Sequence, residues 1–210
     1  MDQKQAVVKM YTDFKSPYSY LAFEPGLDLP KRFDVTLCWL PFESRQRGAG
    51  ERSMYSERKY QYSWIDVRRW GRPRGLQFEP PIKVYDSKPA LIGGMFAQRK
   101  GLLREYGREV FRRFFIRDLE IDKADAVAGV IEGLGMDRDA FLRYHAGAGA
   151  DDLRAAREES IKDRVFGVPF FDFDGEQFWG NDRLALLERR LAEKGYAKPS
   201  MSSSGAAAHP

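Results

Sequence analysis

The stretch Asp13-Phe14-Lys15-Ser16-Pro17-Tyr18-Ser19-Tyr20-Leu21-Ala22, residues 13–22, decides the fold. It follows a short run of β-branched and aromatic residues, Ala6 to Asp13, which predicts a buried strand. Ser16 followed by Pro17 is typical of a helix N-cap and first helical position, so a helix is expected to begin there. A second β-rich run, Asp34 to Phe42, completes a strand–helix–strand order that favours a parallel pair.

The rest of the chain divides into a helical stretch and a second strand-forming stretch. From Glu51 to Arg164 apolar residues recur at helical spacing and no strand pattern stands out. Strand patterns return at Val168 to Phe173 and at Gln177 to Trp179, and Asp174-Gly175 between them predicts a hairpin turn. A last helix is expected after Asn181-Asp182. We therefore predict an α/β chain with a thioredoxin-like fold and an inserted all-helical domain.

The predicted domain boundaries follow these changes of pattern. Residues 1–50 and 165–195 are assigned to the thioredoxin-like domain, and residues 51–164 to the inserted helical domain. Residues 196–210, which are mostly small and polar, are expected to form a flexible tail. Within the helical stretch, Trp64, Trp70 and the cluster from Phe111 to Phe115 are predicted to be core residues.

Composition narrows the class of protein. Hydrophobic residues make up 43% of the 210, enough for a sizeable core. The 35 basic and 31 acidic residues leave a net charge of +4, and the basic residues are scattered among acids, which argues against a nucleic-acid partner. No apolar run approaches the roughly 18 residues of a membrane span, and no signal-peptide pattern is visible. We expect a cytoplasmic protein that binds neither nucleic acid nor membranes.

Metal and thiol chemistry find little support. The single cysteine, Cys38, cannot form an intramolecular disulfide, and its place in a predicted strand favours a small core residue over a nucleophile. The two histidines, His145 and His209, are not at metal-ligand spacing. Neither a zinc motif nor a Walker loop nor G-x-G-x-x-G is present. We therefore expect no metal site.

A second stretch, Gly167-Val168-Pro169 with Trp179-Gly180-Asn181-Asp182-Arg183-Leu184, completes a family pattern. With residues 13–22 it resembles the 2-hydroxychromene-2-carboxylate isomerases and kappa-class glutathione transferases, members of the DsbA-type superfamily. The resemblance covers nearly the whole chain, to about Leu191. It implies a thioredoxin-type fold, glutathione as cofactor, a small organic acid as substrate, and a homodimer.

The resemblance gives Ser16 the catalytic role. Ser16 and Ser19 stand where redox relatives keep their two cysteines, and hydroxyls cannot carry out thiol–disulfide exchange. At a helix N-terminus, which favours anions, the Ser16 hydroxyl would donate a hydrogen bond to the glutathione thiolate and lower the pKa of the thiol. The alternative is plain: Ser-Pro is also an ordinary helix start.

The same resemblance assigns the remaining glutathione contacts. Val168-Pro169 would form a cis-proline loop facing the serine, whose backbone pairs with glutathione as an added strand would. The alternative is a trans proline that opens a strand. Trp179, Gly180, Asn181 and Asp182 would contact the γ-glutamyl end, because a carboxylate suits an ammonium group and helix-start N–H groups suit a carboxylate. Asn181 and Asp182 also suit a capping role.

One segment departs from the family pattern. Where family isomerases carry a Lys and an Asn-rich turn to hold substrate, residues 43–53 carry three arginines. Arg45, Arg47 or Arg52 is predicted to clamp a substrate carboxylate, and the alternative is a solvated charged loop. Tyr85 is expected in the loop that contributes to the substrate cavity.

Three functions remain open at this point. The first is glutathione-dependent cis–trans isomerisation of an unsaturated aromatic-ring-cleavage acid through a reversible adduct. The second is a glutathione transferase, in which the adduct leaves. The third is a non-catalytic thioredoxin-like binding module.

Overall fold

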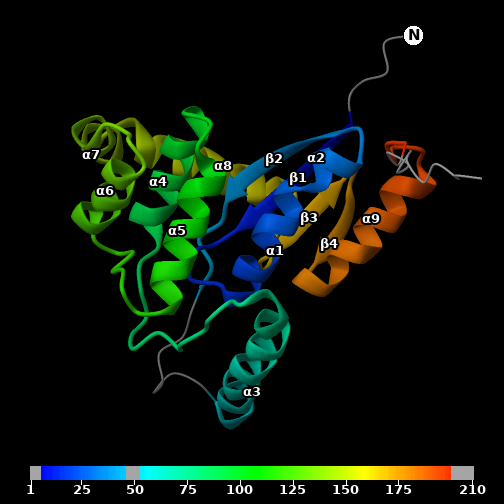
Figure 1. The fold of residues 1–210 in the computed structure, drawn as a ribbon, viewed down its shortest axis with the longest axis horizontal. Helices are drawn as coiled ribbons and strands as arrows, with labels where there is room; N and C mark the ends of the chain where they lie inside the picture. The colour runs from blue at the N-terminus through cyan, green and yellow to red at the C-terminus, as the bar shows by residue number, and fades with distance from the viewer. Residues whose placement is uncertain (1–5, 46–52, 200–210) are drawn as a thin grey trace, which may run out of the picture.

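The centre of the molecule is a four-stranded sheet in the order β2-β1-β3-β4 (Figure 1). A computed structural model describes residues 6–45 and 53–199. The strands are β1 (Ala6–Thr12), β2 (Val35–Pro41), β3 (Phe170–Phe173) and β4 (Glu176–Trp179). β1 pairs in parallel with β2 and antiparallel with β3, and β3 forms a hairpin with β4. The predicted parallel pair and hairpin are confirmed, and β1 shares one sheet with β3 and β4, which come more than 150 residues later in the sequence.

Helices cover the sheet and form a further layer beside it (Figure 1). In chain order they are α1 (Pro17–Leu27), α2 (Leu29–Arg32), α3 (Met54–Gly71), α4 (Lys88–Arg99), α5 (Leu103–Phe115), α6 (Ala124–Gly133), α7 (Arg138–Ala146), α8 (Ala148–Lys162) and α9 (Leu184–Glu193), with 3₁₀ turns η2 (Arg72–Arg74) and η3 (Asn181–Arg183). The described residues between β2 and β3 contain helices and no strand, as predicted.

The alternation of β1 decides which helix covers which face of the sheet. Met10 points toward α1, where a Cβ on Gly26 would come within 2.6 Å of the Met10 sulfur. Lys9 and Tyr11 point to the opposite face and reach Asp163, next to the end of α8. The sheet therefore lies between α1 and α8.

One aromatic core joins the sheet to the inserted helices. The ring of Phe14, just after β1, lies 6.2 Å from Trp39 of β2 and 5.6 and 4.8 Å from Tyr106 and Phe111 of α5. Phe14, Tyr106 and Phe111 are fully buried. This core contains residues from both predicted domains, so it does not mark a boundary between them. The division of the chain into two domains stays a prediction.

The two tryptophans of α3 have different environments. Trp64 is buried, with 7% of its surface exposed, as predicted, and its ring lies 6.1 Å from that of Phe115 at a tilt of 58°. Trp70 is 50% exposed, so its assignment to the core is wrong. Six residues turn a helix by about 240°, so the two side chains leave α3 in different directions.

Tyr196, the first residue of the predicted flexible tail, is bound to the rest of the fold. The carbonyl of Tyr196 accepts a hydrogen bond from the backbone N–H of Asp34 at 2.7 Å. The Tyr196 ring packs edge-on against Phe173 at 5.7 Å between centroids. The prediction of a tail beginning at residue 196 therefore places its start too early. Residues 200–210 lie outside the described part of the chain.

Candidate functional site

Ser16 is the N-cap of α1 and also faces the loop before β3. Its backbone is extended, with φ −93° and ψ 116°, and its Oγ accepts a hydrogen bond from the N–H of Ser19 at 3.2 Å. The same hydroxyl donates to the carbonyl oxygen of Val168 at 3.3 Å. The two interpretations of Ser16, as a cap and as a residue facing that loop, are therefore compatible. Its catalytic role stays a prediction.

The position of a second redox cysteine is occupied by a buried hydroxyl. Ser19 is fully buried, and its Oγ accepts a hydrogen bond from the N–H of Asp13 at 3.4 Å. Cys38, the single cysteine of the chain, lies away from this turn in β2 and is half-buried. Burial raises the pKa of the Cys38 thiol, which keeps it protonated at neutral pH. The site thus contains no dithiol pair.

The loop before β3 has the predicted backbone geometry. The peptide bond between Val168 and Pro169 is cis. The carbonyl of Pro169 accepts a hydrogen bond from the N–H of Gly180 at 3.0 Å, and Phe170 pairs with Trp179 across the hairpin. These bonds bring the loop, the end of β4 and the start of η3 together beside Ser16.

An aromatic pair flanks this loop on its exposed side. The rings of Phe166 and Trp179 meet edge-on at 4.9 Å, and half or more of each side chain is exposed. Gly167 lies beneath the indole, where a Cβ would come within 2.8 Å of Trp179 Nε1. A glycine at this position lets the indole lie against the loop backbone.

Asn181 and Asp182 form η3 and do not cap a helix. The N-cap position of α9 is held by Arg183, without a side-chain cap, so the capping interpretation is wrong. The Asp182 carboxylate pairs with Arg183. Burial and the Asp66 carboxylate raise the pKa of Tyr18, and the charge of Asp182 adds to this rise. Asp182 therefore lies within electrostatic range of the first turn of α1.

A buried ion pair next to Ser16 has no counterpart in the sequence prediction. The fully buried carboxylate of Asp13 accepts hydrogen bonds from the N–H of Lys15 at 3.2 Å and from the hydroxyl of Ser44 at 2.6 Å. The Lys15 ammonium lies 3.7 Å from the same carboxylate and donates to the carbonyl of Tyr85 at 3.4 Å. The sequence contained a signal for this pair: Asp13 and Ser44 each follow one of two parallel strands. The carboxyl ends of such strands meet at one edge of the sheet, where ligands bind.

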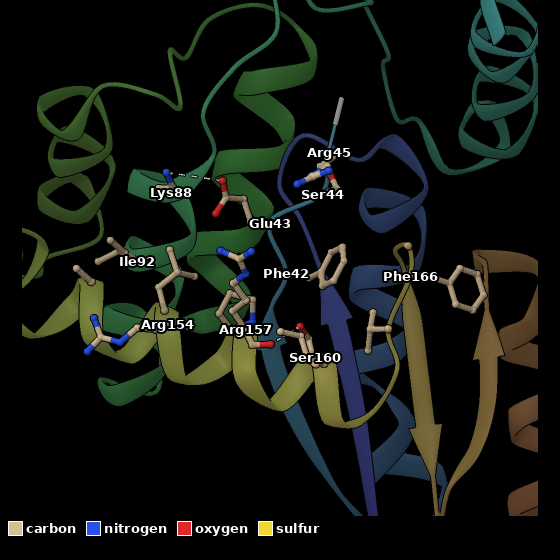
Figure 2. A pocket seen from close by; sticks show the side chains of 16 residues that line it. Phe42, Glu43, Ser44, Arg45, Lys88, Ile92, Arg154, Arg157, Ser160 and Phe166 are labelled. Atoms are coloured by element: carbon tan, nitrogen blue, oxygen red, sulfur yellow. Dashed lines mark hydrogen bonds and ion pairs between the residues drawn. The ribbon is translucent and has the colours of Figure 1, made fainter. Parts of the chain in front are cut away.

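A cavity of about 890 Å³ opens beside this turn, between the end of β2, α4 and α8 (Figure 2). Residues 41–45 line one side, Lys88 and Ile92 of α4 and several residues of α8 line the others, and residues 165–167 close it near the loop. The volume suits a small organic ligand. Apolar side chains such as Phe42 and Ile92 alternate with charged ones around it.

The predicted substrate residues are only partly brought together. Arg45 lines the cavity, whereas Arg47 and Arg52 lie outside the described residues. Tyr85 is buried and does not line it; its ring packs edge-on against Phe114 at 5.2 Å. The Tyr85 carbonyl instead binds the lysine beside Ser16. The substrate roles of these residues stay predictions.

Within the described ranges, no group of three or more His, Cys, Asp or Glu side chains is arranged to hold a metal ion. None of the helices in those ranges combines the length and the apolar character that crossing a membrane requires.

Comparison with known families decides the relationship. Residues 7–192 match the DSBA-like thioredoxin domain. The chain belongs to this family. The match runs from β1 into α9 and takes in all the strands and helices described above except the first residue of β1 and the last residue of α9. The predicted thioredoxin-like fold with a helical insertion is thereby confirmed.

The relatives of this DSBA-like chain include named enzymes. The 2-hydroxychromene-2-carboxylate isomerase of Pseudomonas putida is 28% identical over 191 residues, covering 88% of this chain and 94% of the relative. A solved structure of 2-hydroxychromene-2-carboxylate isomerase superposes with a TM-score of 0.76 at 26% identity, covering 90% and 96% of the two chains. The cytosolic disulfide reductase DsbM from Pseudomonas aeruginosa, solved with GSH, shares the fold at a TM-score of 0.60 and 15% identity, covering 89% and 99%. The family resemblance read from the motifs is confirmed.

Proposed function

We propose that this DSBA-like chain is a glutathione-dependent isomerase of the 2-hydroxychromene-2-carboxylate isomerase type. Its substrate is an unsaturated acid derived from cleavage of an aromatic ring. The proposal is supported by the similarity to named isomerases over most of the chain. It rests chiefly on one observation: a hydroxyl, Ser16 Oγ, occupies the start of α1 and faces the Val168 carbonyl at 3.3 Å. The family resemblance implies that redox relatives keep a cysteine at this position.

The residues around Ser16 fit glutathione. The N-terminus of α1 favours an anion, and the exposed aromatic edge of Trp179 and the carboxylate of Asp182 lie beside the same loop. Val168 is half-buried, and the backbone of its loop would pair with a peptide as an added strand does. A fold relative, DsbM, is known with GSH, which supports this cofactor for the fold. When bound, glutathione would supply a thiolate that adds reversibly to a conjugated carbon, so that a double bond becomes free to rotate.

The role proposed for Ser16 is to donate a hydrogen bond from its hydroxyl to that thiolate. Its bond to Val168 is long for an O–H···O hydrogen bond, so the hydroxyl can turn to a better acceptor at small cost. A hydrogen bond to the charged form of a thiol lowers the thiol pKa and so raises the share of thiolate at neutral pH. Ser19, which is buried and bonded to Asp13 N–H, leaves no resolving group in reach.

An absorbance assay tests the proposal directly. The purified chain is mixed with 2-hydroxychromene-2-carboxylate, with and without glutathione, and free glutathione is measured before and after turnover. We expect isomerisation that depends on glutathione and returns it unconsumed. Consumption of glutathione with formation of a conjugate would instead indicate a transferase. Binding of glutathione without turnover of any acid would indicate a binding module, and isomerisation at the same rate without glutathione would refute the cofactor.

A further inference from the structure

The cavity next to Ser16 has an excess of positive charge. Among the residues that the structure describes, Arg45, Lys88, Arg154 and Arg157 line it, against one acidic side chain, Glu43. Such a surface attracts anions and would repel a cationic ligand. The charge excess therefore points to an anionic ligand.

The three cations that α4 and α8 contribute are not equally available. Lys88 lies 3.8 Å from Glu43, and Arg154 pairs with Asp151 at 2.8 Å. Arg157, on α8, has no ion-pair or side-chain hydrogen-bond partner among the residues that the structure describes. Figure 2 shows its guanidinium pointing from α8 into the cavity. Arg157 can therefore bind an anion without first breaking an ion pair with a described residue.

The helix that carries Arg157 is fixed to the sheet. Lys9 of β1 donates to Glu159 at 2.6 Å and to Asp163 at 2.7 Å, and Tyr11 donates to Asp163 at 2.5 Å. These bonds hold the last turn of α8 against β1. A guanidinium on an anchored helix binds an anion better than one on a flexible loop, because less conformational entropy is lost on binding.

Two residues that line the cavity connect it to the turn that carries Ser16. Gly167, which lines it, precedes Val168, whose carbonyl binds the Ser16 hydroxyl. Ser44, which also lines it, is bonded to Asp13, three residues before Ser16. A ligand in the cavity would therefore have one end near the proposed thiolate position and its other end toward α8.

The apolar walls of the cavity indicate the chemistry of the uncharged part of the ligand. Phe42, Ile92, Leu153 and Val165 offer apolar surface between the charged groups. A flat hydrophobic body with one carboxylate satisfies both features, since apolar walls with a few placed polar groups are typical of sites for small organic molecules. A guanidinium can bind a carboxylate through two parallel hydrogen bonds.

We propose that Arg157 binds the carboxylate of the acceptor, an unsaturated aromatic acid held in this cavity. This inference rests on the proposed function for the identity of the acceptor, and it moves the carboxylate site from the arginines of segment 43–53 to α8. Arg157 lies outside both family motifs, so the resemblance assigned it no role.

Binding of a non-reacting pair of probes tests the assignment. Cinnamate and its uncharged analogue cinnamamide are titrated calorimetrically into the wild type, Arg157→Gln, Arg157→Lys and the control Arg143→Gln, which removes an exposed arginine of α7 outside the cavity. We expect the wild type and the control to prefer the acid, and Arg157→Gln to lose about ten-fold or more in affinity for the acid with little change for the amide. Arg157→Lys should retain part of the preference.

The outcomes separate this inference from the proposed function, because titration needs no turnover. A chain that fails to isomerise yet shows an Arg157-dependent preference for the acid refutes the proposed function and keeps the carboxylate site. A chain that isomerises while Arg157→Gln keeps the full preference overturns the inference alone. Equal affinity of the wild type for acid and amide also overturns it, as does an equal loss in Arg143→Gln. Thermal unfolding of each variant confirms that its fold is intact.

Discussion

The carboxylate of Asp13 accepts two hydrogen bonds from Ser44, from the backbone N–H at 2.8 Å and from the hydroxyl at 2.6 Å. Asp13 directly follows β1, and Ser44 lies on the wall of the cavity. The pair ties the turn that carries Ser16 to the cavity in which we place the acceptor. The proposed thiolate position and the acceptor position are thus held by one buried carboxylate.

We predict that Ser44→Ala destabilises the chain by about 1.5–3 kcal/mol, because it removes a hydrogen bond to a buried charge. The control is Ser63→Ala, which removes the hydrogen bond that the Ser63 hydroxyl donates to the neutral carbonyl of Tyr60 at 2.6 Å. It should lower the free energy of unfolding by only about 0.5–1.5 kcal/mol. Urea unfolding measures both losses. Equal small losses in the two variants would show that Asp13 does not depend on the Ser44 hydroxyl.

We predict that Ser16→Ala lowers turnover at saturating glutathione about a hundred-fold, the effect of losing one donor to a developing anion. Glutathione affinity should hardly change. Both Ser16→Ala and the control Ser53→Ala, which removes the N-cap of α3, should lose about 1 kcal/mol of stability, because each loses a capping bond. Only Ser16→Ala should also lose turnover, which distinguishes it from the control. A wild-type rate in Ser16→Ala would remove its catalytic role and leave it a cap.

We predict that Gly167→Ala disturbs the indole of Trp179, since the added methyl would lie 2.8 Å from its Nε1. The misfit should destabilise by about 1–3 kcal/mol, change the tryptophan fluorescence and weaken glutathione binding. Gly129→Ala is the matched control: it lies in α6 with nothing within 4 Å of a new Cβ, and it should stabilise by up to about 1 kcal/mol. Unchanged fluorescence and glutathione binding in Gly167→Ala would contradict the assignment of Trp179.

We predict that Lys9→Met destabilises the chain by about 1.5–3 kcal/mol, because Glu159 and Asp163 lose charged hydrogen bonds. The control Lys162→Met, which breaks an exposed pair of 3.6 Å with the same Glu159, should cost about 0.2–1 kcal/mol. Urea unfolding at neutral pH compares the two.

The effect of Lys9 should also depend on pH. The hydrogen bond and charge of Lys9 lower the pKa of Glu159 from its ordinary value of 4.5 in the folded chain. Glu159 therefore adds stability above that value, and the gain disappears as the pH falls through the lowered pKa. The stability gap between wild type and Lys9→Met should narrow in acid. A gap of constant size down to low pH would indicate that Lys9 acts through packing alone.

Much of the candidate site could be predicted because its signals are local. Ser16 caps α1 through a hydrogen bond from the N–H of Ser19, three residues away. The cis peptide between Val168 and Pro169 was instead implied by the family resemblance, because most X-Pro bonds are trans. The hairpin turn at Asp174-Gly175 depends on the positive φ of both residues. The cap and the hairpin turn could each be predicted from a few adjacent residues, and both are present.

The errors and omissions concern contacts between distant segments. Trp70 carries the same apolar signal as Trp64, but the direction in which α3 packs leaves one exposed and the other buried. Tyr196 sits among small polar residues, yet it is held because Phe173 and Asp34 happen to lie beside it. A one-dimensional pattern contains no information on which neighbour is available.

The sequence by itself determined the elements, their order, the serine at the start of α1 and the loop that faces it. Only the tertiary structure decided that α8 lies against β1, so that Arg157 enters the cavity beside Ser16 from 141 positions further along the chain. The physical reason is one of range. Caps, turns and strand alternation are set by bonds between near neighbours, whereas a cavity is the space left when helices and a sheet pack, and its lining depends on all of them at once.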